Sequence, residues 1–213
     1  APAVTTKPAP AATTRTPAPG RATTPAPAEN SRTTQDGVTI VELKASDYPT
    51  RTKHNASTSD VTIAFAADFS TAGEKQTKTA AAGKYITAPL SESLKDDGAA
   101  IDMPETWYAS SFMKLVNGAP AIINIAGNTL AKLMKALPNK KDESRADKAV
   151  RAQQLANRIV YQALKALHEK SPITKIVSGG QTGAYIAVAV AAKALGIAVE
   201  VVMLKGFLQQ DIN

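Results

Sequence analysis

The stretch KIVSGGQTGAYIAVAV, residues 175–190, runs from an apolar segment through a glycine-rich loop into a second apolar segment. The first segment is typical of a buried strand and the second of a helix. In a sheet of parallel strands, such a loop leads from the carboxyl end of a strand to the N-terminus of a helix. Helix N-termini attract anions, so the stretch predicts either a phosphate-binding loop or a tight turn in a packed core.

The same order of strand, loop and helix occurs in two earlier stretches. In the second of them, the apolar residues recur at i, i+3, i+4 and i+7 from Leu130, which is the spacing of a helix with one buried face. The three units lie at residues 61–83, 121–137 and 175–204. Their repetition predicts an α/β fold, a Rossmann-like three-layer parallel sheet flanked by helices.

Two further segments connect these units. The longest helical pattern, at residues 141–170, predicts a crossover helix with a charged outer face. Residues 87–120 contain three prolines and the only tryptophan, and we interpret them as an insertion that serves as a lid or a subunit contact. The alternative is a surface excursion with Trp107 and Phe112 in the core.

The N-terminal part has a different composition. Residues 1–36 are mostly Ala, Pro and Thr, which predicts a disordered or extended tail because little apolar surface is available for burial. Residues 37–60 read as a linker in which 38–43 alternates like an edge strand, and the polar stretch around Pro49 indicates a loop. The Rossmann-like domain is therefore expected over residues 61–213.

The composition excludes several classes of site. The 213 residues contain no cysteine and only His54 and His168, so disulfide scaffolds and cysteine-ligated zinc are excluded and no metal site is predicted. The net charge of +7 permits nucleic-acid binding, but no run of alternating basic and aromatic residues supports it. No signal peptide or membrane span is visible, so we expect a cytoplasmic or virion-associated protein without membrane contact.

Ligand contacts are expected from the three loops at the carboxyl edge of the sheet and from one lysine. The expected ligand-binding residues are Ser70, Thr71, Gly73, Gly127, Asn128, Thr129, Ser178, Gly179, Gly180, Gln181, Thr182, Gly183 and Lys205. Backbone N–H groups would hold a phosphate, with Thr182 and Lys205 assisting. A lysine after the last strand, where dinucleotide-binding sheets usually have an acid, argues against NAD.

Asp68 and Glu74 flank the first loop and are the candidates for acid–base catalysis. A carboxylate near a helix N-terminus also acts as a cap, and that alternative stays open. Asn128 could bond a ribose or a base, or it could be a turn or cap residue.

The segments KIVSGGQTGA, AAKALGIAVE and LKG resemble the SLOG superfamily, a Rossmann-like group that includes lysine-decarboxylase-like phosphoribohydrolases and DprA-like proteins. The nearest branch is the molybdenum-carrier-like one, whose hallmark is a Ser-Gly-Gly-Gln-Thr-Gly loop. The resemblance covers residues 61–208 and implies a nucleotide or nucleotide-derived ligand at Ser178–Gly183. Tyr185 departs from it, since that family usually carries Asp there, and this departure suggests a degenerate bacterial or phage member.

Together, these features predict a domain that binds a nucleotide or another phosphorylated ligand, and they identify no further cofactor. The alternative is a structural or assembly protein, such as a virion component with an N-terminal tether. The helix expected at 184–195 is apolar nearly all round, which favours cover by another segment or subunit in a homo-oligomer or larger assembly. If the protein is an enzyme, the resemblance implies hydrolysis of a nucleotide N-glycosidic bond, although the catalytic pattern is incomplete.

Overall fold

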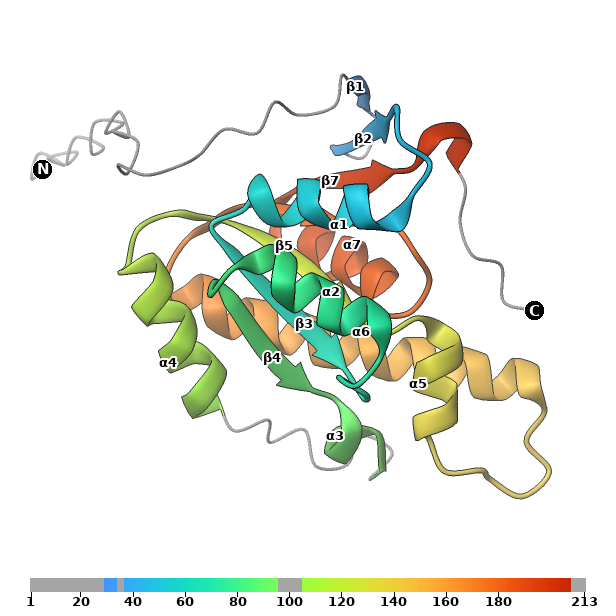
Figure 1. Ribbon diagram of the computed structural model, residues 1–213. Coiled ribbons are helices and arrows are strands. Elements are labelled where there is room, and N and C mark those ends of the chain that lie inside the picture. The colour runs from blue at the N-terminus through green and yellow to red at the C-terminus, as the bar shows by residue number, and fades with distance from the viewer. Residues whose placement is uncertain (1–28, 34–36, 96–104, 208–213) are drawn as a thin grey trace, which may run out of the picture.

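The computed structural model describes residues 29–33, 37–95 and 105–207, and a seven-stranded sheet forms its centre (Figure 1). The strand order is β1-β2-β7-β6-β5-β3-β4, in which β1 is antiparallel to β2 and all other neighbours are parallel. The strands are β1 (Glu29–Thr33), β2 (Val38–Leu43), β3 (Val61–Ala66), β4 (Tyr85–Pro89), β5 (Ala121–Gly127), β6 (Ile173–Ser178) and β7 (Ala198–Met203). The predicted Rossmann-like α/β fold is confirmed.

Helices cover both faces of the sheet and complete the three layers. In Figure 1, α1 and α2 lie in front of the sheet, and α6 and α7 lie behind it. The helices are α1 (Tyr48–Ser57), α2 (Ala72–Ala81), α3 (Ser91–Lys95), α4 (Glu105–Val116), α5 (Leu130–Ala136), α6 (Arg145–Lys170) and α7 (Ala184–Leu195), with a short 3-10 turn, η1 (Lys205–Phe207). The three strand–loop–helix units predicted from the sequence are all present.

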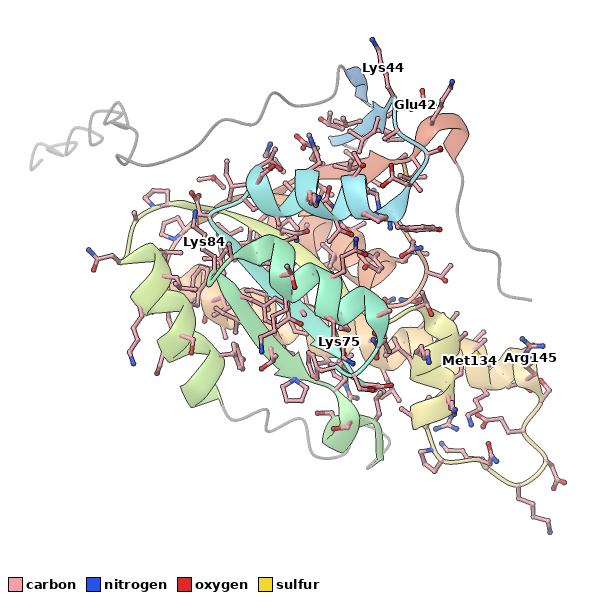
Figure 2. All side chains as sticks on the ribbon, in the orientation of Figure 1. Glu42, Lys44, Lys75, Lys84, Met134 and Arg145 are labelled. Carbon is pink, nitrogen blue, oxygen red and sulfur yellow. The ribbon has the colours of Figure 1, made fainter. Side chains whose placement is uncertain are left out.

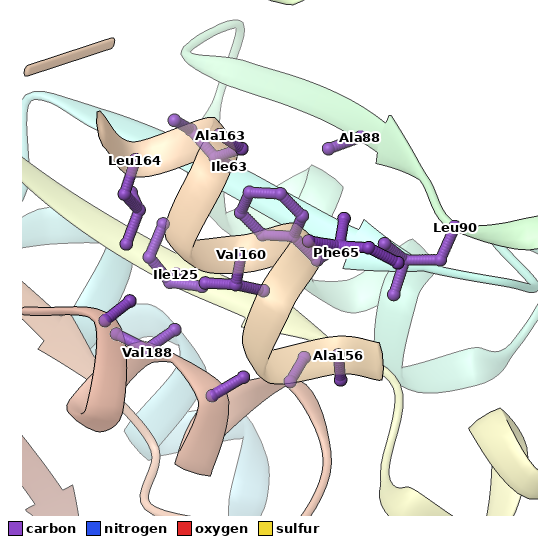
Figure 3. Close-up of a cluster of buried hydrophobic side chains, with 14 of the residues drawn as sticks. Ile63, Phe65, Ala88, Leu90, Ile125, Ala156, Val160, Ala163, Leu164 and Val188 are labelled. Atoms are coloured by element: carbon purple, nitrogen blue, oxygen red, sulfur yellow. The ribbon is translucent and has the colours of Figure 1, made fainter. Parts of the chain in front are cut away.

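The face of the sheet toward α6 and α7 carries the main apolar core. Phe65 and Ile125 from the strands pack with Val160 and Leu164 of α6 and with Val188 of α7 (Figure 3). The run VTIAFA of β3 is buried at every residue, as expected for a central parallel strand covered on both faces. This side of the sheet therefore stabilises the fold.

The opposite face, under α1 and α2, is much more polar. A small apolar cluster lies there, formed by Val41, Leu43, Val177 and Val202. Polar and charged residues account for much of the remaining buried surface, namely Arg51, His54, Asn55, Thr62, Thr77 and Asn124. Buried polar groups need partners, so this side of the sheet depends on hydrogen bonds more than the opposite side does.

The predicted loop around Pro49 is wrong, because residues 48–57 form α1. The Asp47 side chain accepts a hydrogen bond of 2.8 Å from the backbone N–H of Thr50, and Pro49 occupies the first turn, so both act as helix-start signals. The helix is polar because the layer beneath it is polar. The strand predicted at residues 38–43 is present as β2, but it does not lie at the edge of the sheet, because it pairs with β7 on one side and with β1 on the other.

The described residues between 87 and 120 belong to elements of the α/β fold. They contain the end of β4, then α3, and then α4, which leads the chain back to β5. Phe112 is fully buried in the main core, as the alternative interpretation expected, while the side chain of Trp107 lies outside the described residues. The tail prediction concerns residues 1–28 and 34–36, which also lie outside the described part, and residues 29–33 form β1.

Candidate functional site

The carboxyl ends of β3 and β5 form the switch point of the sheet. From β3 the chain continues to β4 on one side, and β5 lies on the other side of β3. Loops diverge at such a point and leave a crevice where parallel sheets bind ligands. A cavity of about 270 Å³ lies there. Its lining consists of Tyr48, Arg51, Thr52, Thr71, Gly73, Glu74, Gln76, Thr77, Gly127, Asn128, Thr129, Lys132, Gln181 and Tyr185.

The structure brings together only part of the predicted site. Seven predicted residues line the cavity, namely Thr71, Gly73, Glu74, Gly127, Asn128, Thr129 and Gln181. Seven others do not belong to its lining, namely Asp68, Ser70, Ser178, Gly180, Thr182, Gly183 and Lys205. Lys205 is exposed beyond β7, and β6 separates that strand from the switch point. Gly179 lines a smaller chamber beside the cavity.

Asn128 ties the two switch-point loops together. Its Oδ1 accepts hydrogen bonds of 2.9 and 3.0 Å from the backbone N–H groups of Ala67 and Asp68. Its Nδ2 donates to the carbonyl oxygen of Asp68 at 3.2 Å and to Oε1 of Glu74 at 3.3 Å. The amide is thus engaged at both ends within the protein, which matches the turn role considered for it rather than contact with a ribose.

Glu74 is the buried acid of the site. The residue is 5% exposed and lies in the first turn of α2, where Thr71 caps the helix. Oε2 accepts a hydrogen bond of 3.1 Å from the hydroxyl of Tyr85. Burial raises the pKa of Glu74 to about 7, against the opposing effect of the hydrogen bonds from Tyr85 and Asn128, and the charge of Asp68 adds to the rise. Glu74 can therefore exchange a proton near neutral pH.

Asp68 has the opposite electrostatic behaviour. Its Oδ1 accepts hydrogen bonds from the hydroxyl of Ser70 at 2.6 Å and from the backbone N–H of Ser70 at 2.8 Å. These bonds lower the pKa of Asp68, so the group stays ionised at neutral pH. Of the two predicted catalytic carboxylates, only Glu74 faces the cavity.

The glycine-rich loop is packed against the protein at its end. The amide of Gln153 in α6 accepts a hydrogen bond of 2.9 Å from the N–H of Gly183 and donates one of 3.0 Å to its carbonyl oxygen. The N–H of Ala184 donates to the carbonyl oxygen of Asn128 at 3.3 Å. Two N–H groups at the start of α7 are therefore used internally, and the expected phosphate cradle is only partly available.

Arg51 supplies a buried positive charge to the cavity. The residue is 4% exposed, and its guanidinium lies 4.8 Å from the centre of the Tyr48 ring. Nη1 donates a hydrogen bond of 2.9 Å to the carbonyl oxygen of Gly179. Within the described part of the chain, no carboxylate forms an ion pair with it. Burial lowers the pKa of Arg51, but an arginine remains a cation at neutral pH.

Gly179 lies close to the guanidinium of this arginine. A Cβ atom at residue 179 would lie 3.1 Å from the guanidinium carbon of Arg51, which is closer than ordinary van der Waals contact. The first loop glycine therefore lies directly against a protein cation. Sequence reasoning missed Arg51 and Tyr48, although Asp47 followed by Pro49 could have identified their helix.

Other kinds of site find no support in the described ranges. No group of three or more His, Cys, Asp or Glu side chains there could hold a metal ion. None of the helices in these ranges has the length and apolar character needed to cross a membrane. In comparisons with known proteins, the chain matches no family model, no curated protein and no solved structure.

Proposed function

We propose that the protein binds a small phosphorylated ligand, a nucleotide or a nucleotide-derived sugar phosphate, in the switch-point cavity. The observation that carries this proposal is Arg51, a buried guanidinium that lines the cavity without a carboxylate partner among the described residues. A buried charge is costly unless it is paired, so an anionic ligand would complete its environment. Guanidinium groups bind phosphate well because their donors match its oxygens.

Three further features support a small anion. Lys132 lines the cavity and is exposed, so it adds a positive charge at the entrance. The N-terminal turn of α2, with Thr71 and Gly73, also borders the cavity, and helix N-termini favour anions. The volume of about 270 Å³ is near the lower end of small-molecule sites, which favours a mononucleotide or smaller compound over a dinucleotide. The resemblance of residues 178–183 to the SLOG loop is the reason for naming a nucleotide-derived ligand.

Arg51→Gln is expected to weaken ligand binding by at least about 100-fold, because charge-assisted hydrogen bonds to phosphate are lost. The measurement is a thermal-shift titration with inorganic phosphate, ribose 5-phosphate and nucleoside monophosphates. A ligand at about 100 times its Kd should raise the melting temperature of the wild-type protein by about 5–10 °C.

The matched control is Arg145→Gln. Arg145 is exposed at the start of α6, well away from α1 (Figure 2), so this variant should respond like the wild-type protein. Without ligand, Arg51→Gln should be about as stable as the wild type, because the buried charge disappears together with its hydrogen bond to Gly179. The proposal fails if no phosphorylated compound shifts the wild type or if Arg51→Gln responds equally.

A second candidate function is a role in assembly, which two apolar side chains on α7 favour. Ile186 and Val190 are 39% and 48% exposed, and they lie one helical turn apart. The rest of the predicted all-apolar helix is mostly covered by α6 and the sheet. Val190→Lys should convert an oligomer into a smaller species in light scattering, whereas Val150→Lys on α6 should not. A monomeric wild type would exclude this role.

A further inference from the structure

The switch-point cavity is bordered by a buried acid as well as by a buried cation. Glu74 and Arg51 both line it, and both are buried. They do not form an ion pair with each other, and no other cation among the described residues pairs with Glu74. The two side chains that donate hydrogen bonds to its carboxyl, Tyr85 and Asn128, are neutral. A negative charge on Glu74 therefore has no directly paired cation in this part of the chain.

The charge of a phosphate ester makes this acid important for binding. Such an ester carries about two negative charges above pH 7, whereas Arg51 supplies one positive charge to the cavity. An ionised Glu74 repels such a ligand, and the repulsion is strong because the carboxyl is shielded from water. A protonated Glu74 carries no charge and leaves the attraction by Arg51 intact.

The hydrogen bonds around Glu74 assign its proton to one oxygen. Oδ1 of Asn128 accepts from the backbone N–H groups of Ala67 and Asp68, which fixes the orientation of the amide. Nδ2 of Asn128 therefore donates to Oε1 of Glu74, and Oε1 remains an acceptor. Oε2 faces the hydroxyl of Tyr85, which can donate to a carboxylate or accept from a carboxylic acid. Glu74 can thus gain a proton at Oε2 when one O–H bond rotates.

Several other titratable groups surround Glu74. Hydrogen bonds from Ser70 lower the pKa of Asp68, and burial raises the pKa of Tyr85 and of Tyr185, so the aspartate stays ionised and both tyrosines stay protonated near neutral pH. Burial raises the pKa of Glu74 to about 7, where its charge changes. The remaining titratable or charged side chains on the elements around it are Tyr48, Arg51 and His54 of α1, Lys75 and Lys78 of α2, and Lys132 of α5, and of these His54, Lys75 and Lys78 do not belong to the cavity lining.

We propose that the protein takes up a proton at Oε2 of Glu74 when it binds a phosphorylated ligand, so that Glu74 determines the charge of the anion that the site accepts. With this proton the site binds a doubly charged phosphate ester, and without it binding is weak. The inference rests on the proposed function, since it concerns the same ligand in the same cavity. A ligand in a cavity of about 270 Å³ lies within several ångströms of Glu74, where repulsion should weaken binding by about 10- to 100-fold.

The test is isothermal titration of the wild type and Glu74→Gln with ribose 5-phosphate from pH 6 to pH 9. Glutamine mimics the protonated acid, because its amide can accept from Asn128 and donate to Tyr85. Comparing the two proteins at each pH cancels the titration of the ligand itself. Near pH 6 their affinities should agree within about 3-fold, and at pH 9 Glu74→Gln should bind about 10- to 100-fold more tightly than the wild type.

A second measurement counts the proton directly and needs no variant. Titrations at pH 8 in buffers with different ionisation enthalpies should show that the wild type takes up about half a proton per ligand bound. Glu74→Gln should take up almost none. The control is Glu169→Gln, an exposed position on α6, which should follow the wild type in both measurements.

Three results overturn the proposal while the phosphate site stands. The first is the same pH dependence of affinity in the wild type and Glu74→Gln, which would assign the titration to another group such as His54. The second is an equal loss of affinity in Glu74→Gln at pH 6 and pH 9, as a purely structural role predicts. The third is binding without proton uptake by the wild type at pH 8. If the wild type binds ribose 5-phosphate at no pH, the proposed function fails as well.

Discussion

Gly183→Ala is expected to lose at least about 3 kcal/mol of unfolding free energy, one of the two largest effects on stability predicted for this chain. A Cβ atom at this position would lie 2.6 Å from the backbone nitrogen of Leu130 and 2.7 Å from the carbonyl oxygen of Asn128. Both neighbours are backbone atoms that cannot rotate away. The φ angle of 89° adds strain for any residue with a side chain. Urea denaturation measures the loss.

Gly196→Ala is the matched control for that experiment. Gly196 ends α7 with a φ of 68°, but a Cβ atom there would have no neighbour within 4 Å. Its loss should be about 1 kcal/mol, from backbone strain alone. Equal losses in the two variants would contradict the close packing of the loop against α5. The difference between the two losses of unfolding free energy measures the effect of the close contacts of residue 183 with the backbone of Asn128 and Leu130.

Glu74→Gln is expected to stabilise the protein by about 3 kcal/mol at pH 8 and to change little near pH 4. The pKa of Glu74 is raised from 4.5 to about 7 in the folded protein. Between these values the folded state binds more protons at this group than the unfolded chain, so its contribution to stability falls as pH rises. The difference between the two pKa values corresponds to a loss of about 3 kcal/mol in unfolding free energy at a pH where Glu74 is ionised in both the folded and the unfolded state.

Glutamine removes this pH dependence because it cannot ionise, and it can still hydrogen-bond Tyr85 and Asn128. The measurement is the unfolding free energy of both proteins from pH 4 to pH 8. The exposed Glu169→Gln on α6 is the control, and it should stay within about 0.5 kcal/mol of the wild type. If the curves of Glu74→Gln and the wild type run parallel over this range, the raised pKa is wrong.

The periodic parts of the chain are the parts that the sequence predicted well. Runs such as VTIAFA in β3 and the spacing from Leu130 in α5 reflect burial in a layered α/β core, which hydrophobic patterns report directly. Because parallel strands share one carboxyl edge, the convergence of the first two loops at a single site could also be predicted. Thr71 of the first loop and Asn128 of the second line the same cavity for this reason.

The charged part of the site was not predictable from periodicity. Helix α1 packs on the sheet through Arg51, His54 and Asn55, so its pattern is that of an exposed polar loop. The helix-start signals at Asp47 and Pro49 are local and do not depend on burial, so they are the sequence features that indicate α1. The glycine-rich loop was interpreted from its residues alone, whereas its geometry depends on Gln153 and on the backbone of Asn128.

The most direct test of the central claim is the position of a bound phosphate. Crystals of the protein soaked with ribose 5-phosphate should show the phosphate in the switch-point cavity, within hydrogen-bond distance of the guanidinium of Arg51. The same soak of Arg51→Gln should show no ligand there. Density for the compound elsewhere on the protein, with an empty cavity in the wild type, would contradict the claim.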